Sequence, residues 1–268
     1  MQQAHDYLAE ASELATILTG QPESIFAQKT LFKSWTINDV IGHLYMFDVA
    51  ALKSLQSAAE FDAFYTQISE RLDEGMSLLE SQYPYLKDLS GKRLFLKWQK
   101  NSQNLGEAYA KSDPKKRLKW VGPDMSAMSS ITARQMETWA HGQEIFDALG
   151  LSRPAHDRIK NICHLGVATF GWSFQNRRIE VPQPRPYVSL KAPSGKIWEW
   201  NNPASPHSIQ GDALDFATVV TQVRHIRDTN LKIKGAIAKQ WMEIAQCFAG
   251  KPENPPVQGT RFTKQNPI

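Results

Sequence analysis

The sequence has 268 residues, of which 41% are hydrophobic and 22% charged, so it can form a folded core and is not expected to be disordered. Its formal net charge is +4, without the basic clusters typical of nucleic-acid binding, so no nucleic-acid partner is expected. No apolar run of about 18 residues is present to span a membrane. The N-terminal residues lack a signal-peptide pattern. We therefore expect a cytoplasmic protein with no membrane partner and length enough for two domains.

The first 150 residues have the pattern of a helical bundle. Apolar residues recur at helical spacing, and glycine or proline follows most of the periodic segments. Thr36 is a natural N-cap for one helix, and Asp39 can complete a capping box with it. Short connections between long helices predict a bundle. The expected helices are 3–19, 36–59, 59–81, 91–111 and 129–149.

After Arg153-Pro154 the pattern changes to short strands mixed with helices. This mixture predicts a small α+β domain. The expected helices are 155–176, 214–223 and 236–248, and the expected strands are 187–191, 196–200, 207–210 and 231–234. The predicted organisation is a helical bundle over residues 1–152, an α+β domain over 153–252 and an extended tail over 253–268.

Three side chains of the bundle have the types and spacing of a metal site. Glu137 and His141 are four residues apart, so they share one face of a helix. His43 lies inside an apolar helix, where its ring nitrogens need partners. Two imidazoles and one carboxylate from facing helices are a ligand set that leaves coordination positions open. The alternative at this point is a core histidine hydrogen-bonded to a carboxylate of another helix.

The segments WTINDVIGHL (35–44) and RQMETWAHGQEIFDALG (134–150) resemble the DinB-like metal-binding superfamily. The similarity is closest to the branch that contains mycothiol-dependent maleylpyruvate isomerase. Three further segments look like an uncharacterised subfamily of that branch: 120–127, 212–231 and 241–250. The resemblance implies a mainly α fold, in which an up-and-down DinB-like bundle is followed by a small α+β sterol-carrier-like domain.

The resemblance also implies that His43, Glu137 and His141 hold a divalent metal, zinc first, with nickel or iron as alternatives. It implies a low-molecular-weight thiol at the open position and an electrophilic small-molecule substrate. A divalent ion lowers the pKa of a thiol. Addition and later elimination of the thiolate would permit cis–trans isomerisation, and its retention would give S-transfer. A homodimer is compatible with such bundles, although no heptad repeat argues for one.

Other polar residues are candidates for supporting roles. Glu144 and Asp48 are each either an acceptor for a ligating imidazole or an ordinary surface acid. Arg134 is a candidate anchor for an anionic substrate, and the alternative is that it forms an ion pair at the surface. Arg224 and Arg227 are candidates to bind a carboxylate in bidentate fashion, or they are basic residues at the end of a helix.

Three functions are compatible with this site. The first is a metal-dependent, thiol-using transferase or isomerase. The second is a non-catalytic module with a structural metal that binds an apolar ligand or partner. The third is a metal-dependent hydrolase, in which Glu144 is the candidate general base.

Overall fold

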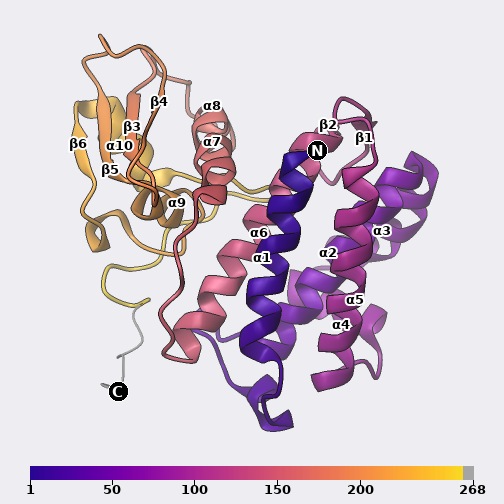
Figure 1. Cartoon of the computed structure of the whole chain (residues 1–268). Coiled ribbons are helices and arrows are strands. Elements are labelled where there is room, and N and C mark those ends of the chain that lie inside the picture. The colour runs from indigo at the N-terminus through magenta and orange to yellow at the C-terminus, as the bar shows by residue number, and fades with distance from the viewer. Residues whose placement is uncertain (262–268) are drawn as a thin grey trace. The chain divides into compact units, whose positions relative to one another are not determined.

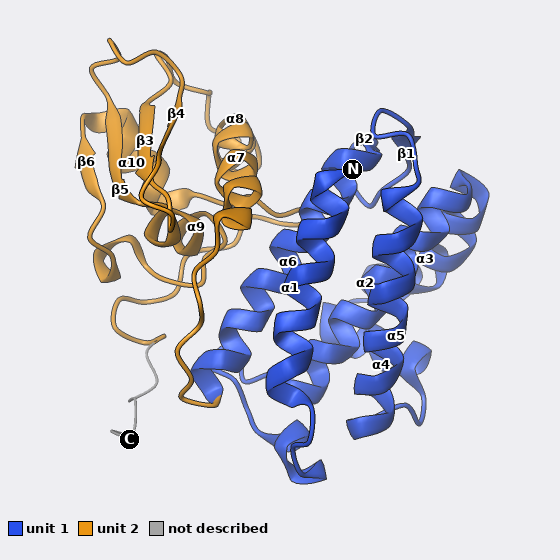
Figure 2. Ribbon diagram, viewed as in Figure 1, with its two compact units in different colours: residues 1–148 blue, residues 149–268 orange. Residues whose placement is uncertain are grey.

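The computed structural model describes residues 1–261, and these form parts of two compact units. The first unit is Met1–Ala148 and the second is Leu149–Ile268 (Figure 2). Residues 262–268 of the expected extended tail lie outside the described residues. Within the described part of the chain, no helix is both long enough and apolar enough to cross a bilayer.

The first unit is the expected helical bundle, in which α1 packs on α5 and α6, and α2 packs on α3, α4, α5 and α6 (Figure 1). Its central helix is α2, which carries fully buried residues such as Val40, Ile41 and Leu44. The helices are α1 (Gln2–Leu18), α2 (Ile37–Gln56), α3 (Ala58–Asp73), α4 (Leu78–Leu86), α5 (Gly91–Ala110) and α6 (Ala127–Ala148), with a 3-10 turn at Glu23–Ala27. Strands β1 (Arg117–Leu118) and β2 (Met125–Ser126) pair between α5 and α6.

The prediction of one helix over 59–81 that ends at Tyr83-Pro84 is wrong. The chain leaves the helical conformation at Gly75, whose φ of 92° is open to glycine without strain. A new helix, α4, then begins directly after Ser77, which caps it and forms a capping box with Glu80. Pro84 lies inside α4, where it removes only one backbone hydrogen bond shortly before the helix ends at Leu86.

The second unit holds the expected α+β mixture. Its sheet has the order β4-β3-β5-β6, in which β3 pairs antiparallel with β4 and parallel with β5, and β5 pairs antiparallel with β6. The strands are β3 (Tyr187–Lys191), β4 (Ile197–Trp200), β5 (Ser208–Asp212) and β6 (Lys232–Lys234). Val188, Leu190 and Ile209 are fully buried, and α9 packs on β3 and β5.

The single helix predicted over 155–176 is divided in the structure. A 3-10 turn (Asp157–Ile159) leads into α7 (Lys160–Ala168), which is followed by α8 (Phe170–Gln175). The break falls at Thr169, whose hydroxyl donates to the carbonyls of Leu165 and Gly166 and so competes with the helical backbone pattern. The remaining helices are α9 (Ala213–Val220) and α10 (Ala236–Ile244), with a 3-10 turn at Ile226–Asp228.

Candidate metal centre

Two of the three candidate ligands project from the middle of α6. Glu137 and His141 are one turn apart, and the Nε2 atom of His141 lies 3.4 Å from Oε2 of Glu137. The His141 side chain is 12% exposed and that of Glu137 is 23% exposed. The Glu137 side chain is therefore more exposed than the imidazole beside it.

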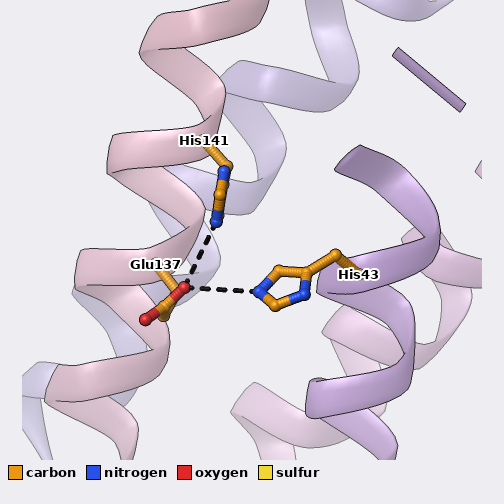
Figure 3. A group of neighbouring side chains, drawn as sticks. All are labelled: His43, Glu137 and His141. Atoms are coloured by element: carbon orange, nitrogen blue, oxygen red, sulfur yellow. Dashed lines mark ion pairs between the residues drawn. The ribbon is translucent and has the colours of Figure 1, made fainter. Parts of the chain in front are cut away.

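The third candidate ligand, His43, comes from α2 and completes the cluster. Its helix is fixed at the start by the expected capping box, in which Thr36 and Asp39 exchange hydrogen bonds, a motif worth about 1 kcal/mol. Nε2 of His43 lies 3.5 Å from the same Oε2 atom of Glu137 (Figure 3). In Figure 3 both imidazoles point a ring nitrogen at one carboxylate oxygen.

The spacing of the three ligand atoms suits a metal ion better than direct hydrogen bonds. Contacts of 3.4 and 3.5 Å are long for N–H···O bonds, which are usually near 2.9 Å. In a tetrahedral zinc site with bonds of roughly 2.0–2.1 Å, two ligand atoms lie about 3.3 Å apart. One ligand atom from each residue, His43, Glu137 and His141, lies within 4.8 Å of the other two. The residues present therefore fit a divalent ion, with open positions for a further ligand.

The protonation states in the cluster also favour metal binding. Burial lowers the pKa of His43 to about 4, although the Glu137 carboxylate opposes the shift. Burial by itself would raise the pKa of Glu137, but the neighbouring imidazoles of His141 and His43 hold it well below its usual range. A neutral imidazole at position 43 and an ionised carboxylate are the forms that coordinate a metal.

Aromatic rings surround the two histidines. The Trp35 ring stacks on that of His141 at 6.0 Å and meets the His43 ring edge-on at 5.5 Å. The ring centroid of Phe32 lies 5.1 Å from that of His141, and the ring centroid of Phe47 lies 4.8 Å from that of His43. No sequence pattern placed Phe32, Trp35 or Phe47 at the site. Their rings make the surroundings of the cluster apolar, which strengthens electrostatic interactions within it.

Gln82 is a further neighbour that sequence reasoning missed. It lies in α4, is fully buried, and its Nε2 atom is 3.3 Å from Nδ1 of His43. Sequence periodicity carried no signal for this contact, because residues 59–81 were expected to form one helix that ended before position 82.

Of the two alternatives for Asp48 and for Arg134, the one that places each side chain on the surface is wrong. Asp48 is fully buried and Arg134 is 2% exposed. Arg134 Nε donates to Oδ1 of Asp48 at 2.9 Å, and the Tyr7 hydroxyl donates to the other carboxylate oxygen at 2.7 Å. Arg134 is thus held by the core, and this pairing occupies the group that was a candidate anchor for an anionic substrate.

The three remaining candidates, Glu144, Arg224 and Arg227, differ in burial and in their contacts. Glu144 is 3% exposed and does not belong to the cluster of ligand atoms, so the hydrolase alternative gains no general base from the geometry. Arg224 and Arg227 belong to the second unit, where Arg224 is half-buried and donates to the Val223 carbonyl. Arg227 is exposed in the 3-10 turn after α9. A catalytic role for Glu144, Arg224 or Arg227 stays a prediction.

Fold and cluster together define a class of protein: a helical bundle with two histidines and one glutamate at its centre, continued by a small α+β unit. A family model described as the mycothiol maleylpyruvate isomerase N-terminal domain matches residues 7–146. The chain belongs to this family.

Relatives that match most of the chain extend the comparison beyond the bundle. An uncharacterised protein of Mycobacterium tuberculosis, matched in two strains, is 34% identical over 92% of this chain and 95% of its own length. The crystal structure of the mycothiol-dependent maleylpyruvate isomerase and that of its point mutant each superpose with a TM-score of 0.53 and 13% identity. Each comparison covers 81% of this chain and 87% of the other, and at this identity the likeness establishes the shared fold.

Proposed function

We propose that this protein is a metal-dependent enzyme that uses a low-molecular-weight thiol, either as an isomerase or as an S-transferase. The observation that carries the proposal is the cluster of His43, Glu137 and His141, whose spacing suits a divalent ion with open positions. The family of the bundle supports it, because the related isomerase is described as mycothiol-dependent. Zinc is the metal we propose first, with nickel or iron as alternatives.

The chain's own residues have distinct tasks in this proposal. Two neutral imidazoles and one carboxylate would bind the ion, which when bound would lower the pKa of a thiol so that a nucleophilic thiolate is present at neutral pH. The partial exposure of Glu137 leaves access from solvent. The rings of Trp35 and Phe32 limit that access and fix the orientation of His141.

Cobalt substitution tests the proposed thiol chemistry directly. Protein loaded with Co²⁺ is titrated with mycothiol and with 2-mercaptoethanol while the absorption spectrum is recorded. A thiolate-to-cobalt charge-transfer band that saturates with thiol is expected for wild type and for the surface variant His5→Ala. Wild-type protein that holds cobalt but develops no such band with any thiol would contradict the thiol-using function and leave a structural metal as the better explanation.

The same titration tests the two arginines of the second unit, which we propose bind a carboxylate of the thiol or substrate. A carboxylate-bearing thiol such as 3-mercaptopropionate is compared with the neutral 2-mercaptoethanol. Replacing Arg224 and Arg227 by alanine should weaken binding of the acidic thiol by about tenfold or more, the worth of one charged hydrogen bond. Binding of the neutral thiol should not change. An equal effect on both thiols would argue for a structural role of these arginines.

A further inference from the structure

The contacts of Gln82 define how the His43 ring is held in the structure. The Nε2 atom of Gln82 carries two hydrogens and has two acceptors in reach, the Leu78 carbonyl at 3.0 Å and Nδ1 of His43 at 3.3 Å. Its Oε1 atom is buried and has no hydrogen-bond partner among the residues that the structure describes. A buried amide oxygen without a partner is costly and calls for a physical explanation.

These contacts fix the tautomer of the His43 ring. When Nδ1 accepts from Gln82, the single proton of the neutral ring lies on Nε2, which faces Glu137. Coordination of a metal by Nε2 needs the reverse arrangement, with a free lone pair on Nε2 and the proton on Nδ1. The Nδ1–H group then needs an acceptor, as the second nitrogen of a ligating histidine almost always has.

We propose that Gln82 is the positioning residue of His43 and that its side-chain amide changes role when the metal binds. Without the ion, Nε2 of Gln82 donates to Nδ1 of His43. With the ion, the amide turns about its last torsion angle, which has a broad and roughly two-fold preference, and the unpartnered Oε1 accepts from Nδ1–H. The turn gives up the side-chain contact with Leu78. The inference rests on the proposed metal site and adds to it a residue from a third helix.

Alternative roles for Gln82 make different predictions. A residue that only fills space could be replaced by leucine without effect on metal affinity. A residue that supplies an acceptor should be replaceable by glutamate, because a carboxylate accepts from Nδ1–H at least as well as an amide oxygen does. The two substitutions Gln82→Leu and Gln82→Glu therefore separate packing from hydrogen bonding.

The experiment is a zinc competition titration of the full-length protein against a chromophoric chelator. The variants are wild type, Gln82→Leu, Gln82→Glu and, as a surface control, Gln103→Leu, with thermal unfolding of each metal-free protein recorded to confirm folding. We expect Gln82→Leu to bind zinc about 10–100-fold more weakly, the usual effect of losing such a partner. Gln82→Glu and Gln103→Leu should bind at least as tightly as wild type. Equal affinity of Gln82→Leu and wild type, or equal weakening in both Gln82 variants, would overturn the inference while the metal site stands.

A second measurement needs no substitution of Gln82. Long-range proton–nitrogen correlation spectra of the wild-type histidine rings, assigned with His43→Gln, report which ring nitrogen carries the proton. We expect the Nε2–H form in metal-free protein and the Nδ1–H form after zinc is added. An Nδ1–H form in metal-free protein would overturn the proposed exchange. Wild-type protein that binds no zinc at all would overturn both the exchange and the metal-dependent function.

Discussion

At the residue scale, the surroundings of His43 hold its ring in the neutral form. The ring is 7% exposed, and its pKa in the folded protein is about 4, whereas an unfolded chain has a value near 6.5. Neighbouring aromatic rings, among them Trp35 and Phe47, exclude water that would solvate an imidazolium. His43 is therefore ready to coordinate a metal at neutral pH and below it.

This difference in pKa predicts how the stability of the metal-free protein depends on pH. Between pH 6.5 and pH 4 the unfolded chain binds a proton at His43 and the folded protein does not, so acid favours unfolding. We expect the His43 ring to remove about 2 kcal/mol from the free energy of unfolding between pH 7 and pH 5.

Urea unfolding of chelator-treated protein at both pH values measures this loss, with His43→Gln as the comparison. The wild-type protein should lose about 2 kcal/mol more than the variant does over this interval. Parallel losses in the two proteins would show that His43 is not buried in the neutral form.

At the scale of the elements, a buried ion pair connects the helices that carry the candidate ligands. Asp48 of α2 accepts from Arg134 of α6 and from Tyr7 of α1, and Arg134 also donates to the Leu44 carbonyl. Arg134 lies one turn before Glu137, and Asp48 lies little more than one turn after His43. The pair thus joins the two ligand-bearing helices close to the site.

Breaking this pair should destabilise the protein strongly. Asp48→Ala leaves the Arg134 guanidinium buried without its partner, and such changes typically cost 3–5 kcal/mol. The double variant Asp48→Leu with Arg134→Met removes both charges and should unfold at a higher urea concentration than Asp48→Ala. If Asp48→Ala lowered the free energy of unfolding by less than about 1 kcal/mol, the pair would contribute no more than an exposed ion pair does, which would contradict its burial.

The same elements show what sequence reasoning reached and what it missed. Helices α2 and α6 follow from local signals, among them the capping box at Thr36 and the four-residue spacing of Glu137 and His141. That His43 joins this pair is what the resemblance to the DinB-like superfamily implies, and the structure places the three side chains together. The burial of Asp48 and Arg134 depends on how three helices meet, which no local pattern reports. Gln82 approaches His43 only because α3 and α4 are separate helices.

Sequence reasoning also misplaced helix ends inside two of the helical segments. Gly75 and Thr169 end helices through their own backbone or side-chain chemistry, whereas Pro84, the expected end, lies inside one. Glycine, threonine and proline each occur inside some helices and end others. Packing against neighbouring helices decides between them.

At the scale of the whole molecule, the candidate metal cluster belongs to the first unit and the candidate arginines belong to the second. The matched relatives from Mycobacterium tuberculosis span nearly the full chain, so the two units recur together in them. Family membership and the cluster of His43, Glu137 and His141 support the proposed function, in which the bundle would hold the ion. The proposed function depends on metal binding by the bundle.

Elemental analysis measures metal binding by the bundle. The full-length protein is purified without chelators or a histidine tag, and its zinc content is measured together with that of His43→Ala, His141→Ala and the exposed control His5→Ala. We predict about one zinc or similar divalent ion per chain in wild type and His5→Ala, and almost none in the two ligand variants. A wild-type protein that holds no metal even after zinc is added, or ligand variants that keep it, would contradict the account and leave His43, Glu137 and His141 as a buried polar cluster.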